Sequence, residues 1–109
     1  MARTKSLTDE QLSEIGKFFG ILQEPTRLKL LIALRDRAHN VTELTEILGM
    51  KQANVSKHLA IMFSAGIVTR EKEGLESYYS VEEKGIYQLC ELVCGQIQSK
   101  AKRNLSKLK

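Results

Sequence analysis

Apolar and polar positions alternate most regularly between residues 41 and 66, where the pattern predicts two helices joined by a tight turn. Helical spacing places four apolar residues on one face of the first helix: Val41, Leu44, Ile47 and Leu48. A second apolar face follows on Val55, Leu59, Met62 and Phe63. Gly49 lies between the two faces and is typical of a helix C-terminus. Residues 41–66 are therefore predicted to form a helix-turn-helix.

The second of these helices carries a row of polar side chains between its apolar positions. Gln52 and Asn54 have amides of the kind that pair with adenine in the major groove, and Ser56 can contact a base or a phosphate. Lys57 and His58 suit phosphates, which set affinity and register more than sequence choice. An ordinary amphipathic helix carries a similar row as its solvated face. The turn and the flanking elements favour contact with DNA instead.

Two further helices are predicted before this motif. Thr8 and Gln11 have the spacing of a capping box. The helix that they open carries an apolar face of Leu12, Ile15, Phe18, Phe19 and Leu22. Pro25 suits the first turn of the next helix, because its missing N–H costs nothing there. The apolar positions of that helix are Leu28, Leu31, Ile32 and Leu34. Asn40 and Glu43 form a second capping box at the start of the helix-turn-helix.

The apolar period changes after residue 66. Residues 67–70 and 77–81 predict two strands, and the turn between them has Gly74 at its tip. Ser80 and Glu83 are predicted to cap a long last helix. Its apolar face consists of Ile86, Leu89, Cys90, Val93, Cys94, Ile97 and Ala101. The predicted fold is mainly α, with four helices, a β-hairpin wing and a fifth helix, which is the order of a winged helix-turn-helix.

Composition narrows the class of protein. The 109 residues, of which 42% are hydrophobic and 28% charged, predict a single domain spanning 1–109. The net charge of +4 suits a polyanionic partner. No apolar run approaches the roughly 18–20 residues that cross a bilayer. Residues 1–10 lack the hydrophobic segment of a secretory signal, so we expect a cytoplasmic protein with no membrane partner.

No feature of the sequence indicates an enzyme. It contains no nucleophile–base pair within a supporting motif and no glycine-rich phosphate loop. The two histidines and the few clustered carboxylates suggest no site that we could name. An enzyme is therefore not expected, and no catalytic residue is assigned.

Three segments together resemble the ArsR/SmtB family of small prokaryotic repressors. They are EPTRLKLLIAL, VTELTEILGMKQANVSKHLAIMFSAGIVTRE and the hairpin end YYSV, within residues 18–90. The resemblance implies a homodimer held by the first and last helices, with two recognition helices in successive major grooves of a pseudo-palindromic duplex. It also implies base contacts from Gln52, Ala53 and Ser56, with His58 near the DNA backbone.

The chain departs from the family pattern at two places. Lys51 stands at the N-cap of the recognition helix, where family members commonly place a serine. In the wing, Arg70 and Lys72 are expected to reach phosphate or the minor groove, while Glu73 and Glu76 are expected to repel DNA. We therefore expect a weaker contribution from this wing than is usual in the family.

Members of this family carry sensor sites at defined places on their helices. The thiol motif of the third helix is absent from VTELTEIL. The places of the last-helix zinc site hold Glu83, Gly85, Gln96 and Ser99. The two histidines are His39, expected in a loop, and His58, expected on the DNA face, so no metal site is expected.

The two cysteines lie on the last helix. Cys90 and Cys94 are four residues apart and share the face expected at the dimer seam. They are either buried interface packing or sensor thiols for arsenite, a soft metal, a persulfide or an oxidant. No other cofactor is expected. The sequence thus predicts a homodimeric DNA-binding repressor that releases DNA on thiol-based sensing. The alternatives are a winged-helix protein adaptor and a regulator of this family without a sensor.

Overall fold

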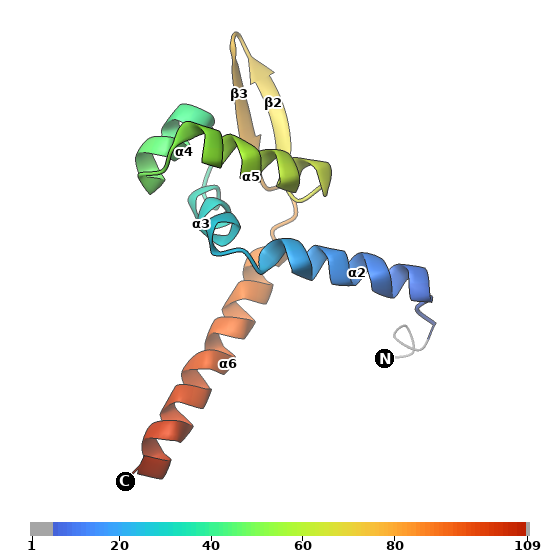
Figure 1. Ribbon diagram of the computed structural model, residues 1–109, viewed down its shortest axis with the longest axis vertical. Coiled ribbons are helices and arrows are strands. Elements are labelled where there is room, and N and C mark those ends of the chain that lie inside the picture. Colours follow the sequence, from blue (N-terminus) through green and yellow to red (C-terminus); the bar gives the residue numbers. More distant parts are fainter. Residues whose placement is uncertain (1–5, 109) are drawn as a thin grey trace.

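A computed structural model describes residues 6–108, with the elements labelled as in Figure 1. The helices are α2 (Asp9–Leu22), α3 (Pro25–Ala33), α4 (Val41–Leu48), α5 (Gln52–Ser64) and α6 (Gly85–Leu108). The strands are β1 (His39–Asn40), β2 (Thr69–Glu73) and β3 (Glu76–Ser80). The predicted order of four helices, a hairpin and a last helix is confirmed. Residues 1–5, the start of the segment predicted to lack a secretory signal, lie outside the described residues.

The predicted starts of α2, α3 and α4 and the stop at Gly49 are confirmed, whereas α3 ends at Ala33, earlier than predicted. Both capping boxes are present: Thr8 and Gln11 open α2, and Asn40 and Glu43 open α4. Pro25 occupies the first turn of α3. Gly49 ends α4 with a φ of 63°, the left-handed conformation that glycine adopts without steric cost.

The sheet has one strand more than the sequence predicted. β1 pairs with β3 and β3 pairs with β2, both antiparallel, in the order β1-β3-β2. Strand β1 has no signal in the sequence, because two residues are too few to show an alternating pattern. The hairpin loop is also shorter than expected, since Glu73 pairs with Glu76 and leaves only residues 74–75 unpaired. Gly74 has a φ of 63°, as a tight two-residue hairpin turn requires.

The core lies where α3, α4 and α5 pack together at the base of the hairpin. Its buried apolar residues are Leu30, Leu31, Leu34, Leu44, Val55, Leu59, Met62, Ile67, Val68, Val81, Ile86 and Tyr87. The prediction for α3 was partly wrong, because Leu30 is fully buried whereas Ile32 is 68% exposed. Two residues of the predicted helix-turn-helix faces also lie outside the core: Ile47 is 54% and Phe63 38% exposed.

The last helix starts later than predicted. Ser80 belongs to β3 and does not cap a helix. Glu83 does accept a hydrogen bond at the start of α6, from the backbone N–H of Gly85 at 3.2 Å. The buried hydroxyl of Tyr87 donates to the carbonyl of Leu31, which fixes the start of α6 against α3.

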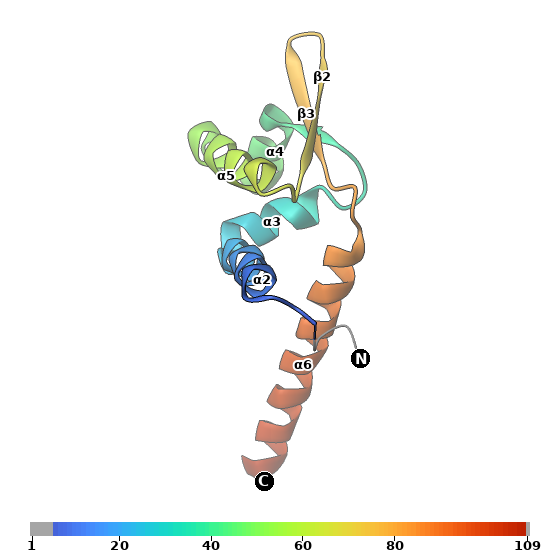
Figure 2. The same cartoon turned by 90° about the vertical axis from the view of Figure 1, so that its right-hand side faces the viewer.

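Helices α2 and α6 extend away from the winged body of the molecule (Figures 1 and 2). The radius of gyration is 17.1 Å, compared with about 13 Å for a compact chain of this length. None of the helices in the described part of the chain is long and apolar enough to cross a membrane.

Candidate nucleic-acid interface

Helix α5 presents one buried face and one exposed polar face. Val55, His58, Leu59 and Met62 are buried. The exposed set contains five of the predicted contact residues: Gln52, Ala53, Asn54, Ser56 and Lys57. The first two turns of α5 therefore project a polar surface away from the core, at the end of the helix that follows the turn at Gly49.

The N-terminus of α5 has no side-chain cap. Lys51 is the N-cap residue, and its side chain makes no capping hydrogen bond. Its carbonyl accepts hydrogen bonds from the backbone N–H groups of Asn54 and Val55, each at 3.1 Å. The backbone N–H groups of Gln52 and Ala53 lie in the first turn, where no carbonyl of the helix is placed to accept their hydrogen bonds. The positive end of the helix dipole is therefore open to an anion such as a DNA phosphate.

The expected placement of His58 on the exposed DNA face was wrong, and its contact with the DNA backbone stays a prediction. Its side chain is only 7% exposed and points into the fold, so it does not lie on the polar face of α5. His58 Nδ1 accepts a hydrogen bond from Nε of Arg27, on α3, at 3.2 Å. Burial is the main cause that lowers the pKa of His58, and the charge of Arg27 lowers it further. A neutral, hydrogen-bonded imidazole is the result. Helical spacing alone did not reveal a partner 31 residues away.

The wing separates its charges by face. Side chains alternate along a strand, so Arg70 and Lys72 of β2 share one face with Ser77 and Tyr79, the residues opposite them on β3. On this face the guanidinium carbon of Arg70 lies 4.2 Å from the ring centroid of Phe63, at the C-terminal end of α5. The two wing cations predicted to bind DNA are thus on the face that contacts α5.

The wing acids lie on the opposite face. Glu71 and Glu73 alternate with the cations, and Glu73 pairs in register with Glu76. The expectation that Glu73 and Glu76 repel DNA stays a prediction. The alternation confines Glu73 and Glu76 to the face that does not contact α5.

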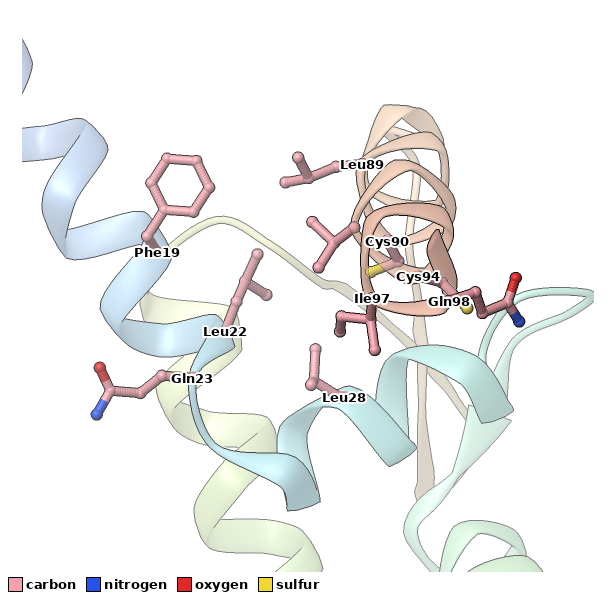
Figure 3. A pocket seen from close by; sticks show the side chains of 10 residues that line it. Phe19, Leu22, Gln23, Leu28, Leu89, Cys90, Cys94, Ile97 and Gln98 are labelled. Carbon is pink, nitrogen blue, oxygen red and sulfur yellow. The ribbon is translucent and has the colours of Figure 1, made fainter. Parts of the chain in front are cut away.

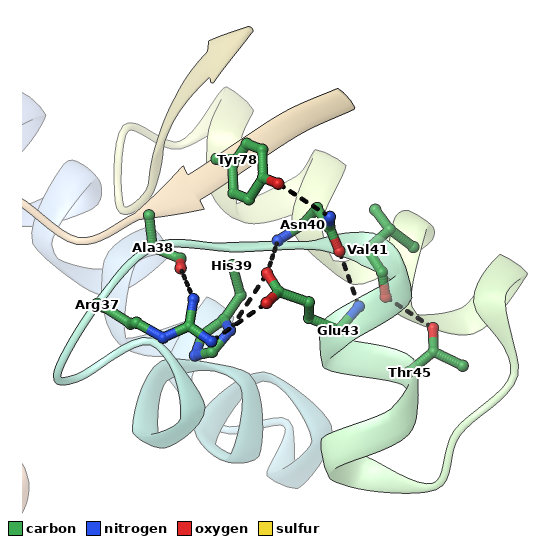
Figure 4. A network of polar contacts seen from close by, with 8 residues as sticks. All are labelled: Arg37, Ala38, His39, Asn40, Val41, Glu43, Thr45 and Tyr78. Atoms are coloured by element: carbon green, nitrogen blue, oxygen red, sulfur yellow. Dashed lines mark hydrogen bonds and ion pairs between the residues drawn. The ribbon is translucent and has the colours of Figure 1, made fainter. Parts of the chain in front are cut away.

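A polar network joins the wing to the start of α4 (Figure 4). The backbone N–H of Asn40 donates to Glu43 Oε1 at 3.1 Å, and Asn40 Oδ1 accepts from the backbone N–H of Glu43 at 2.8 Å. Asn40 also donates through Nδ2 to the hydroxyl of Tyr78, on β3, at 3.4 Å. The hydrogen bond from the Asn40 backbone, followed by that from Arg37, lowers the pKa of Glu43. These contacts hold the hairpin at a set angle to the helix-turn-helix.

His39 was expected in a loop but lies in β1 and is 7% exposed. Its Nδ1 is 3.5 Å from Glu43 Oε1. In residues 6–108 no group of three or more His, Cys, Asp or Glu side chains could hold a metal ion.

The two cysteines border a cavity between α2, α3 and α6 (Figure 3). Both thiols are free; Cys90 is half-buried and Cys94 is exposed. The cavity has a volume of about 410 Å³. Its lining consists of Phe19, Leu22, Gln23, Leu28, Leu89, Cys90, Val93, Cys94, Ile97 and Gln98. These residues are all uncharged, so the two thiols and the two amides supply the polar chemistry of the described cavity wall.

Similar proteins identify the class of this molecule. The family described as bacterial regulatory protein, arsR family, matches residues 24–70. The arsenical resistance operon repressor of Bacillus subtilis is 34% identical over 97 residues, which cover 86% of this chain and 90% of that repressor. The HTH-type transcriptional regulator KmtR of Mycobacterium tuberculosis is 34% identical over 83 residues, covering 76% of this chain. The aligned part is 64% of KmtR's own length.

The fold has a close counterpart among solved structures. A homodimeric winged helix-turn-helix DNA-binding domain from Mycobacterium bovis superposes with a TM-score of 0.74 at 22% identity, covering 90% of this chain and 94% of that domain. The molecule is thus a winged helix-turn-helix protein, as predicted. The relatives described above show that the chain belongs to the ArsR family of bacterial regulatory proteins.

Proposed function

We propose that this protein is a homodimeric, sequence-specific DNA-binding repressor, without enzymatic activity, that acts in the cytoplasm. The observation that carries the proposal is that α5 has a buried face and an exposed polar face. The buried face packs into the core, and the exposed face carries Gln52, Asn54, Ser56 and Lys57. The uncapped N-terminus of α5 and the wing cation Arg70 flank this surface. A polar helix face between two phosphate-binding features suits insertion into a major groove.

The proposed dimer uses the two helices that extend from the body. Apolar residues are exposed on both: Leu12, Ile15, Phe18 and Phe19 on α2, and Leu92, Val93, Ile97 and Leu105 on α6. The chain exposes 8394 Å² of surface, whereas a compact monomer of 12.3 kDa exposes about 6,100 Å². A second copy packed on α2 and α6 would cover this apolar surface. It would present two α5 helices about 34 Å apart to a pseudo-palindromic site.

The test is selection of bound DNA from a random duplex pool, with sedimentation of the protein measured in parallel. We expect an enriched sequence with two-fold symmetry, binding that weakens steeply as salt rises, and a mass of two chains. Phe19→Glu should give a single-chain mass and lose affinity for the selected duplex, whereas Leu75→Glu, at the 99% exposed wing tip, should leave the mass unchanged. Absence of duplex binding at low salt would favour a protein adaptor.

We further propose that Cys90 and Cys94 sense a thiol-reactive species and that its binding releases DNA. Support comes from their position four residues apart on α6, beside an uncharged cavity, and from the similarity to an arsenical resistance operon repressor. Cys90→Ser combined with Cys94→Ser should bind the selected duplex normally and fail to release it when arsenite or oxidant is added. Unchanged release would remove the thiols from the mechanism and leave a regulator whose cysteines only pack.

A further inference from the structure

The strongest unexplained feature is the part-buried contact between Arg27 and His58, because it connects three elements. Nε of Arg27 donates to His58 Nδ1 on α5 at 3.2 Å. Nη1 of the same guanidinium donates to the carbonyl of Ile21, in the last turn of α2, also at 3.2 Å. One side chain on α3 therefore ties the end of α2 to the middle of the recognition helix.

The same α2–α3 corner forms one wall of the cysteine cavity. Leu22, Gln23 and Leu28 lie within residues 21–28, on either side of the position that carries Arg27. Figure 3 shows Leu22 and Leu28 directed toward the α6 side chains that include Cys90 and Ile97. A group on the thiols that fills the cavity and presses on its lining has to displace this corner, α6 or both, because the close-packed residues behind the lining have no slack.

We infer that the α2–α3 corner couples the cysteine cavity to the recognition helix, with Arg27 as the positioning residue that transmits the movement to His58. The inference rests on the proposed DNA-binding function, and it deepens that function by assigning the route of regulation. Displacement of Leu22 or Leu28 shifts the backbone on both sides of Arg27. The Arg27 guanidinium then loses its hydrogen bond to either Ile21 or His58. Because His58 lies on the buried face of α5, losing this hydrogen bond changes the orientation of α5 and of its exposed polar face.

The first measurement does not involve DNA. N-ethylmaleimide is the probe: a cysteine sulfur bonds to one alkene carbon, the thiol proton ends on the other, and no oxidant is needed. The ring signals of the two histidines are recorded by NMR before and after complete modification, verified by mass. We expect the His58 ring signals to move and those of His39, in β1, to stay, so that His39 serves as an internal control.

Variants separate the proposed route from a general disturbance. Cys90→Ser with Cys94→Ser should leave His58 unchanged by the reagent. In the Arg27→Gln protein the reagent should also leave the His58 signals in place. In the Lys29→Gln protein, which lacks an exposed cation of the same helix, the His58 signals should move as in the parent chain. Arg27→Lys, which retains the charge, provides a second test if Arg27→Gln fails to fold.

The second measurement is affinity for the selected duplex. The modified parent protein should lose about tenfold or more in affinity, a typical allosteric coupling, and the modified Arg27→Gln protein should lose much less. His58→Gln keeps an acceptor for Arg27 and should retain the response, whereas His58→Leu should not.

Three results would overturn the coupling. They are His58 signals that do not move on modification, folded protein whose thiols do not react, and modified protein that sediments as a single chain. A protein that binds no duplex would instead refute the proposed function, and the NMR result would still decide whether the corner is coupled to α5.

Discussion

Arg70 of the wing and Phe63 of the recognition helix form a cation–π contact, with the guanidinium carbon 4.2 Å from the ring centroid. Phe63 looked like a core residue from its helical spacing, but its ring is partly exposed and serves as the platform for Arg70. The contact fixes the base of the wing against α5. A wing cation held in place loses less side-chain entropy when it binds a phosphate than a free one does.

Phe63→Leu should therefore weaken DNA binding without a direct contact to DNA. Exposed cation–π contacts contribute roughly 0.5–1 kcal/mol, so we expect affinity for the selected duplex to fall about two- to fivefold. In the Arg70→Ala background the same change should have almost no effect, which a double-mutant cycle would measure. Leu75→Ala, at the wing tip, is the matched apolar control. Additive losses in the cycle would mean that Phe63 does not position Arg70.

The exposed residues of α5 should divide into two kinds of contact. Gln52→Ala should relax sequence preference at one base pair and cost about 1–3 kcal/mol on the preferred duplex. Lys57→Ala should weaken all duplexes alike and reduce the salt slope by about one. Lys17→Ala, which removes an exposed cation from α2, is the control for net charge. Equal losses on preferred and random duplexes for Gln52→Ala would remove it from base recognition.

The sequence revealed the elements whose signals are local. Capping boxes at Thr8 and Asn40, the proline start of α3 and the glycine stop at Gly49 all depend on neighbours within four residues, and all were confirmed. Patterns of this range are set by backbone hydrogen bonding and do not depend on the rest of the fold.

Tertiary contacts explain where the sequence-based interpretation failed. His58 follows the polar residues Ser56 and Lys57 on α5, and its burial and its hydrogen bond with Arg27 show that it faces inward. Strand β1 exists because β3 offers an edge to residues 39–40, which no pattern within two residues can predict. The signal for a buried partner was Arg27 in the EPTRL segment, because a polar side chain that is buried needs a hydrogen-bond partner.

The network at Asn40 predicts that removing the cap of α4 costs more stability than removing the similar cap of α2 at Thr8. Asn40→Ala removes the cap of α4 and the contact with Tyr78, so it should cost about 1–2 kcal/mol. That loss should lower Tm by about 4–8 °C per kcal/mol, which thermal unfolding would measure. Thr8→Ala removes the same kind of cap from the exposed end of α2 and should have a smaller effect. Tyr78→Phe isolates the contribution of the wing contact. A Thr8→Ala loss as large as that of Asn40→Ala would contradict the importance of the α4 network.

Acid should destabilise the fold through His58. Its pKa is lowered in the folded protein, so below about pH 6.5 the unfolded chain binds a proton that the folded chain does not. Stability is therefore complete above that pH and falls as the pH decreases toward the folded-state pKa. The loss from this one group has a ceiling of about 1.4 kcal/mol at pH 5.5.

Thermal unfolding at pH 7.5 and pH 5.5 measures this contribution of His58. His58→Gln should flatten the fall in Tm, because glutamine takes up no proton and still offers Arg27 an acceptor. His39→Gln serves as the control at the second histidine and should keep the slope caused by His58. If His58→Gln retains the full acid loss of the parent protein, then the imidazole is not held neutral by its burial against Arg27, and the pH dependence has another origin.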